Sequence, residues 1–174
     1  MSVTPATAAS DSATAHISRA TIEAAATRIA PFIIETPLIE SPRLNDKLGI
    51  RLLVKAECLQ HTGSFKLRGA SNAVWSLNDT VKHVVAFSSG NHAQGVARAA
   101  ASRGLQATIV MPKDSPAGKI EGTKAYGGTV ILYDRYTESR EEIGADLATR
   151  KQAHLIKPFD AVSYTHLRAH ETHN

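Results

Sequence analysis

The sequence predicts an α/β fold with a parallel sheet flanked by helices, and three observations support this. Short continuous apolar runs such as ATIVM (107–111) and TVILY (129–133) have the length and β-branched content of buried strands. Segments of helical character alternate with these runs. Glycines at 104, 127 and 128 follow the intervening helices, as helix ends usually require. Such alternation favours right-handed βαβ units and a sheet buried on both faces.

Two serine caps predict the first two helices. Ser18 can cap a helix that runs to Ile29. Ser41 is followed by a proline, which suits the first helical position, so a short helix is expected there and Gly49 ends it. Prolines between these two helices mark irregular chain.

The remaining elements are expected to alternate. Strands are predicted over 51–56, 84–87, 107–111, 129–133 and 155–159, and helices over 65–77, 91–102, 116–125 and 137–151. The last helix is expected to open with Glu138, Glu141 and Glu142, whose charges suit the positive end of a helix dipole.

Composition narrows the class of protein. The 174 residues allow one domain or slightly more. The net charge of +4 comes from scattered basic residues with 5% aromatics, which argues against nucleic-acid binding and fits small anionic ligands better. The single cysteine, Cys58, excludes an intrachain disulfide, fits a reducing compartment and is expected to be packed.

Neither end of the sequence suggests a membrane protein. Residues 1–17 are rich in Ala, Ser and Thr and lack an apolar core, so they are expected to be a disordered leader and not a signal peptide. No stretch reaches the length needed to cross a bilayer. We therefore expect a cytoplasmic protein.

Residues 161–174 are expected to be non-native. His166 and His170 have a spacing that could place two zinc ligands on one helix face. However, residues 162–172 (VSYTHLRAHET) are identical to the translation of a sequencing-library adapter in one reading frame, and an eleven-residue match by chance is negligible. Natural sequence is therefore expected to stop near Asp160 or Ala161, and no metal site is predicted.

The segment TGSFKLRGA (62–70) is the first candidate for chemistry. Lys66 is predicted at the opening of a helix, where its charge opposes the helix dipole. Desolvation and a positive field would leave such a lysine a nucleophilic amine, suited to Schiff-base formation. Taken alone, the ordinary reading of a solvated surface lysine is favoured.

The segment FSSGNHA (87–93) is the second candidate. A strand leads through a glycine turn into a helix, and backbone N–H groups at a helix start form an anion site, to which Ser and Asn side chains add donors. A routine helix cap uses the same residues, so both interpretations stay open. The segment lacks the triple-glycine spacing of a dinucleotide site.

Together, SFKLRGA and SSGNHAQGVA resemble the fold-type II pyridoxal-phosphate enzymes, specifically the serine/threonine dehydratase and serine racemase group. TPLIESPRL, RLLVKAE, ATIVMPKDSPAGKI and PFD agree with this, and YDRYTESREEIG is similar to threo-3-hydroxyaspartate dehydratase-like members. The resemblance covers about 22–160. It implies a small α/β domain over 82–160, and it makes 18–81 the first part of a larger cofactor domain. The family's glycine-rich phosphate loop has no counterpart in this sequence.

The resemblance implies roles for the cofactor-binding residues. Lys66 would hold pyridoxal 5′-phosphate covalently as a Schiff base and then move the α-proton of the substrate. Phe65 would lie against the cofactor ring, and Asn91 would hydrogen-bond its phenolic oxygen.

It also implies which residues meet the substrate. The substrate carboxylate would be bound by Ser88, Ser89, Gly90, Asn91 and His92. Ser89 would also act as a second acid/base opposite Lys66 in racemase-like members. Arg140 would approach the substrate in some relatives, whereas His61 and His92 are expected to be structural or solvent-facing.

The parent enzyme is expected to eliminate water from serine, threonine or 3-hydroxyaspartate, giving a keto acid and ammonia. Amino-acid racemisation at the same site is one alternative; a non-enzymatic module binding small anions at residues 89–92 is another, and it would not need an imine-forming Lys66. The parent is expected to be a homodimer or larger homo-oligomer with a small-molecule amino-acid substrate. A divalent-cation site, where the parent has one, would lie outside this piece, which alone is expected to be inactive.

Overall fold

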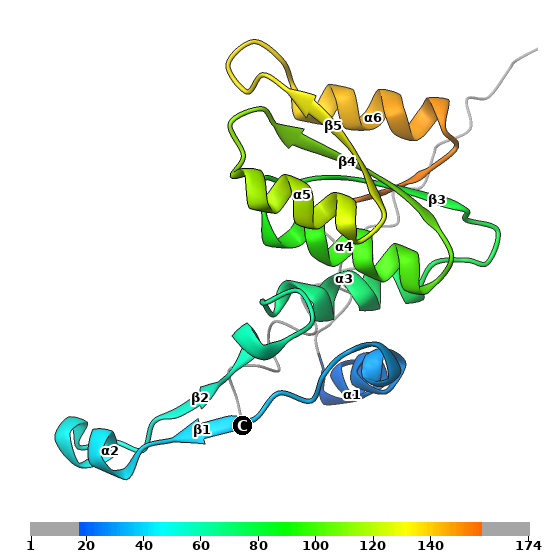
Figure 1. Cartoon of the computed structure of the whole chain (residues 1–174). Coiled ribbons are helices and arrows are strands. Elements are labelled where there is room, and N and C mark those ends of the chain that lie inside the picture. Colours follow the sequence, from blue (N-terminus) through cyan, green and yellow to red (C-terminus); the bar gives the residue numbers. More distant parts are fainter. Residues whose placement is uncertain (1–17, 158–174) are drawn as a thin grey trace, which may run out of the picture.

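The computed structural model describes residues 18–157, which form two sheets (Figure 1). The larger sheet is parallel with strand order β5-β4-β3-β6. Its strands are β3 (His83–Phe87), β4 (Gln106–Pro112), β5 (Gly128–Tyr133) and β6 (His154–Ile156). A separate antiparallel ribbon pairs β1 (Leu38–Glu40) with β2 (Leu53–Lys55). The predicted α/β class with a parallel sheet is confirmed.

Helices cover both faces of the parallel sheet. The helices are α1 (Arg19–Ile29), α2 (Pro42–Leu48), α3 (Lys66–Trp75), α4 (Asn91–Ser102), α5 (Ala117–Ala125) and α6 (Arg140–Arg150), with short 3-10 turns η1 (Ala30–Phe32) and η2 (Glu57–Leu59). Figure 1 shows α4 and α5 on one side of the sheet and α6 on the other. Helix α3 packs on the outer side of α4 and forms a third layer.

The sequence of β3 is continuously apolar because both faces of the sheet are covered. Val84 and Ala86 pack in the cluster that includes α3 and α4, while Val85 and Phe87 pack in the cluster that includes α6. All four side chains are buried, because successive strand residues point to opposite faces and both faces are covered.

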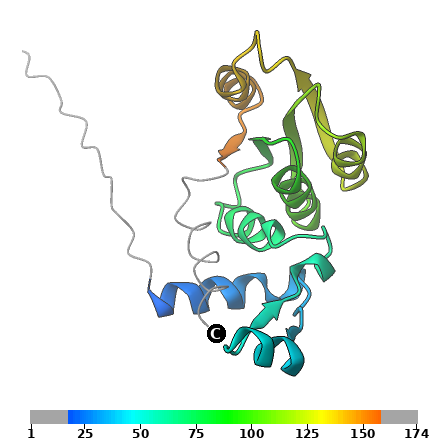
Figure 2. The same ribbon diagram turned by 90° about the vertical axis from the view of Figure 1, so that its left-hand side faces the viewer.

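The N-terminal region stands apart from the parallel sheet. Figure 2 shows α1 and the β1–α2–β2 segment at one end of the molecule and the sheet at the other. Helix α1 packs against α3, and the ring of Phe32 stacks on Trp75 with centroids 3.9 Å apart. Helix α3 therefore contacts both α1 and α4 and so links the N-terminal region to the parallel sheet. In sequence it lies before residue 81, in the region expected to belong to the larger domain.

Serine caps define three helix starts. The side chains of Ser18, Ser41 and Ser139 each accept a backbone N–H from the first turn of α1, α2 and α6. The first two caps confirm the predictions. The expected start of the last helix at 137 was too early, because the Glu138 carboxylate instead accepts the N–H of Asp134 at 2.6 Å in the preceding turn.

Two further expectations were wrong. The chain after Pro37 contains β1, which pairs antiparallel with β2, so β2 is not a strand of the parallel sheet. Cys58 is exposed and not packed, because it lies in the short turn η2, where no sheet covers it.

Other expectations lie outside the described residues. These are the leader (1–17), the expected adapter-derived tail (161–174) with His166 and His170, and the end of the strand predicted over 155–159. Within residues 18–157, no helix is long and apolar enough to span a membrane. In the same range, no three His, Cys, Asp or Glu side chains gather as metal ligands.

Candidate active site

The two candidate segments meet where α3 and α4 begin. A β-carbon added to Gly95 would lie 3.2 Å from the Lys66 carbonyl oxygen and 3.3 Å from the Ala70 β-carbon, so the two helix backbones are in close contact. The positive charge of Lys66 also lowers the pKa of His92. Lys66 and the turn at residues 88–92 are therefore neighbours in space, although more than twenty positions separate them in the sequence.

Lys66 occupies the first position of α3. It is half-buried, and its Nζ lies 5.1 Å from the centroid of the Phe65 ring. Phe65 is the N-cap residue, and no side chain caps this helix. The positive end of the helix dipole therefore surrounds Lys66 with positive potential.

The turn at residues 88–92 follows β3 at the carboxyl edge of the parallel sheet. The Ser88 N–H donates to Val110 O (3.1 Å), which ties the turn to β4. The Gly90 N–H donates to Ser88 Oγ (3.3 Å), and no atom lies within 4 Å of where a Gly90 β-carbon would be. Ser89 is exposed. The turn thus presents the first N–H groups of α4 on an open side, a suitable arrangement for a carboxylate.

His92 is buried just behind this turn. Burial lowers the pKa of His92 to about 4, the charge of Lys66 acts in the same direction, and a backbone hydrogen bond at Ile156 opposes both. The imidazole is therefore neutral near pH 7. This supports the expected structural role, and His92 is not solvent-facing.

Asn91 has a partner that was not predicted. Its Oδ1 accepts a hydrogen bond from Lys119 Nζ at 2.6 Å, and Lys119 also lies 3.5 Å from Gln94 Oε1. Because an ammonium group can only donate, it fixes the amide with its oxygen toward α5 and its NH₂ directed elsewhere. Sequence spacing could not reveal this contact, because it depends on α5 packing beside α4.

Arg140 begins α6 at the same edge of the sheet. Its guanidinium carbon lies 5.3 Å from the centroid of the Phe87 ring, next to the turn that follows β3. A hydrogen bond from Arg140 to Glu141 raises the pKa of the arginine. His61 is exposed, and its carbonyl oxygen accepts the Tyr126 hydroxyl at 2.7 Å.

Comparison with known proteins identifies the family. The family described as "Pyridoxal-phosphate dependent enzyme" matches residues 29–173. The chain belongs to this family. The resemblance stated from SFKLRGA and SSGNHAQGVA is thereby confirmed.

Two similar members of the pyridoxal-phosphate family are an ammonia-lyase and a serine racemase. The chain is 49% identical over 138 residues to the L-threo-3-hydroxyaspartate ammonia-lyase of Saccharomyces cerevisiae, covering 78% of this chain and 42% of that protein. It is 43% identical over 141 residues to a serine racemase of Oryza sativa subsp. indica, covering 80% of this chain and 42% of the relative. The chain spans less than half the length of these relatives.

Solved structures of the family match the fold. Maize serine racemase superposes with a TM-score of 0.83 at 40% identity, covering 88% of this chain and 47% of the other. A threonine deaminase from T.th. gives a TM-score of 0.76 at 46% identity, covering 84% of this chain and 47% of the other. The fold is therefore that of the dehydratase and racemase members.

The residues present fit pyridoxal phosphate. The hydroxyl oxygens of Thr62 and Ser64 are buried in the loop before Lys66 and have no hydrogen-bond partner among the described residues. Beside them lie a primary amine on Lys66, the ring of Phe65 and the start of α4. An amine, an aromatic surface and unsatisfied donors are what an aldehyde-bearing aromatic phosphate requires.

Proposed function

We propose that this chain is part of a pyridoxal-phosphate-dependent dehydratase that removes water from a small hydroxy amino acid. Serine, threonine and 3-hydroxyaspartate are the proposed substrates. Loss of water would leave an enamine, and its hydrolysis by a second water would give a keto acid and ammonia. The observation that carries the proposal is the proximity of Lys66, at the start of α3, to the turn that opens α4. Family membership and the names of the relatives support the reaction class.

Lys66 would hold the cofactor through its amine, and Phe65 would lie against the ring. The Asn91 NH₂ would donate to the cofactor's phenolic oxygen, since Lys119 already occupies the amide oxygen. When bound, pyridoxal phosphate withdraws electrons from the substrate α-carbon and so acidifies its hydrogen. A Lys66 amine released from the cofactor would then accept that proton, as a general base positioned close to the α-carbon.

Residues 88–92 would bind the substrate carboxylate through the N–H groups at the start of α4. Arg140, at the same edge of the sheet, is proposed to approach the distal part of the substrate. A neutral His92 would add no charge to the site. These roles orient the α-hydrogen toward Lys66 and leave the β-hydroxyl free to depart.

Amino-acid racemisation is the second candidate function. It requires an acid/base on each face of the α-carbon, and the exposed Ser89 hydroxyl in the open turn is a suitable second group. A non-enzymatic anion-binding module would use the same turn without Lys66. Oligomerisation of the whole enzyme and a divalent-cation site stay predictions.

A chimera tests the proposed function. The matching segment of this chain would replace its counterpart in the Saccharomyces cerevisiae ammonia-lyase, whose remaining residues complete the protein. We expect keto acid and ammonia from a hydroxy amino acid, and borohydride should trap pyridoxal phosphate on Lys66, as located by peptide mass spectrometry. Lys66→Ala should abolish both signals. Lys66→Arg should abolish them as well, because a guanidinium stays protonated.

The parent ammonia-lyase is the control for the chimera, and a thermal melt confirms that each variant folds. Turnover by the Lys66→Ala chimera, or trapping on a different lysine of the segment, would overturn the assignment.

A further inference from the structure

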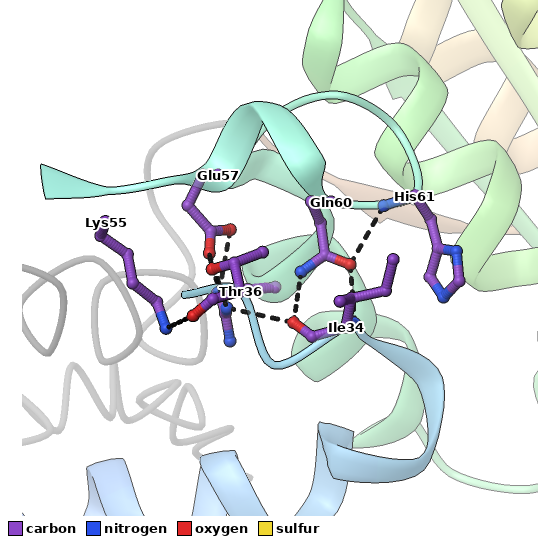
Figure 3. Close-up of polar contacts among 7 residues, drawn as sticks. Ile34, Thr36, Lys55, Glu57, Gln60 and His61 are labelled. Carbon is purple, nitrogen blue, oxygen red and sulfur yellow. Dashed lines mark hydrogen bonds and ion pairs between the residues drawn. The ribbon is translucent and has the colours of Figure 1, made fainter. Parts of the chain in front are cut away.

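A network of buried and half-buried polar side chains joins the chain before β1 to η2 and to the start of α3, and Figure 3 shows its contacts around Thr36 and Glu57. The Arg68 guanidinium contacts both oxygens of Glu57, with Nε to Oε2 at 2.9 Å and Nη2 to Oε1 at 2.6 Å. The side chains are only 13% and 11% exposed. The Thr36 hydroxyl donates to the same Glu57 Oε1 at 2.5 Å. This fork-shaped ion pair therefore joins the start of α3 to η2 and to the chain before β1.

Gln60, which directly follows η2, makes further contacts with the chain before β1. The Gln60 amide pairs with the backbone of Ile34 in both directions, each at 2.9 Å, and Gln60 Oε1 also accepts the His61 N–H at 3.1 Å (Figure 3). Lys55 Nζ donates to Thr36 O at 2.7 Å. Both η2 and the start of α3 are thus fixed to residues 34–36.

Helix α3 has no side-chain cap at its start. Helices α1, α2 and α6 start at capping serines, whereas α3 starts at Phe65 without a side-chain cap. Arg68 follows Lys66 by two positions, which is about 200° around the helix axis. A constraint on Arg68 therefore fixes the rotation of the turn and holds Lys66 on the side facing α4.

We propose that the Glu57–Arg68 ion pair is a positioning device for Lys66, setting the rotation of the first turn of α3 so that the amine is directed to the turn at residues 88–92. The inference rests on the proposed function, in which Lys66 holds the cofactor.

Stability alone does not account for the pair. Buried ion pairs can often be replaced by apolar side chains of similar volume without loss of stability, since desolvation offsets their attraction. Burial acts to raise the pKa of Glu57, but hydrogen bonds from Arg68 and Thr36 outweigh it and lower the pKa overall. Glu57 is thus ionised and the pair neutral, so it directs the helix without adding net charge beside Lys66.

The test compares an apolar replacement with a matched control in the chimera described above. The test variant carries Glu57→Leu and Arg68→Met. The control carries Glu40→Leu and Arg51→Met, which removes a pair with the same two-point geometry (2.9 and 3.0 Å) on the exposed β1–β2 ribbon. Urea unfolding reports stability. The rate of borohydride-trappable attachment of pyridoxal phosphate to Lys66, and the circular dichroism of the bound cofactor, report the position of the amine.

We expect the test variant to stay folded with a modest loss of stability, because the buried Thr36 hydroxyl loses its acceptor. Its attachment rate should fall about 10-fold or more, because small misplacements of a reacting group are costly, and its cofactor dichroism should change. The control should keep both values. A folded test variant with the parent's attachment rate and dichroism would overturn the proposal.

If the apolar variant does not fold, Arg68→Lys provides the test, because lysine keeps the positive charge but cannot make both hydrogen bonds to the Glu57 carboxylate. It should show a smaller change in the same two measurements, and no change would overturn the proposal. Absence of trapping on Lys66 in the parent chimera would instead contradict the proposed function, so the two failures are distinguishable.

Discussion

At the scale of single residues, the proposed function gives acid/base roles to two groups, Lys66 and Ser89. Lys66 extends from α3, and Ser89 is exposed on the turn that opens α4. The rest of the turn is fixed by backbone contacts, through Ser88 to Val110 and through Gly90 to Ser88. Ser89 therefore has a side chain that is not committed to holding the turn together.

Substituting Ser89 should separate the two candidate reactions. In the chimera, Ser89→Ala is expected to lower interconversion of serine enantiomers by about 10²-fold or more, because positioned proton transfer is lost on one face. Elimination should persist, since in the proposed function Lys66 alone would handle the α-proton. Chiral chromatography and a keto-acid assay measure the two rates. Equal retention of both activities would show that Ser89 serves neither reaction.

The buried His92 predicts a pH dependence of folding. Its folded pKa of about 4 lies below the ordinary value of 6.5, so the unfolded chain binds more protons between these values. Stability should be fully present above about pH 6.5 and should decrease as the pH falls toward 4, by roughly 3 kcal/mol at 1.36 kcal/mol per pKa unit. Urea unfolding of the chain at pH 7.5 and 4.5 measures this.

His92→Gln is the control for that measurement. Carboxylates such as Glu57 and Glu40 also have lowered pKa values and add acid sensitivity at lower pH. The variant should therefore show a flatter, though not flat, profile between pH 6.5 and 4.5. An unchanged profile would mean that His92 has the same pKa in the folded and unfolded states.

At the scale of secondary structure, close approach of elements depends on small residues. A β-carbon on Gly128, the first residue of β5, would lie 3.0 Å from both the Ala97 β-carbon and the Thr123 carbonyl oxygen. Gly118 in α5 has open space at the equivalent position. The two glycines thus differ in the space available for a β-carbon.

Alanine at these two glycines should have opposite effects. Gly128→Ala is expected to destabilise the chain by about 1–3 kcal/mol through overpacking. Gly118→Ala should stabilise it by less than about 1 kcal/mol, because a helix favours alanine over glycine, and Gly118 lies in the first turn of α5 and not in its interior. Thermal unfolding of both variants measures the difference. Equal effects would show that β5 can shift away from α4 without cost.

Local sequence signals predicted most elements but not the contacts between them. The start of α4 at Asn91 follows from its glycine turn, and the limits of α2 follow from Ser41 and Gly49. The three-residue strand β1 has no periodicity to detect, since its pairing with β2 defines it. Likewise Lys66 and residues 88–92 could be named from resemblance, whereas Lys119 on Asn91 and Glu57 on Arg68 arise only when the helices pack.

At the scale of the whole molecule, apolar surface is concentrated on one segment. The β1–α2–β2 segment exposes large apolar side chains at Leu38, Ile39, Leu44, Leu48, Ile50 and Val54. Ile39 and Val54 face each other directly across the ribbon, and each is about half exposed. Such surface favours association between molecules.

We expect the chain expressed alone to self-associate through this segment. Ile39→Lys with Val54→Glu should reduce association while keeping the ribbon, because opposite charges across strands are compatible. Sedimentation velocity over a range of concentrations measures the effect, with Leu132→Lys, an exposed residue on β5, as the control. Association that persists in the ribbon variant and disappears in the control would place the contact on the sheet.

The strand order also governs how the sheet can form during synthesis. Strand β3 is the first strand of the parallel sheet to be made, yet its outer neighbour β6 is the last. At about 5–20 residues per second, a nascent chain would keep one edge of β3 unpaired for several seconds after β3 leaves the ribosome. During that interval the backbone N–H and C=O groups of residues 84–86 are available to any other extended segment. A ribosome-bound chain that is truncated before His154 should therefore bind chaperones that capture open strand edges. It should bind them more strongly than a chain that extends past Ile156.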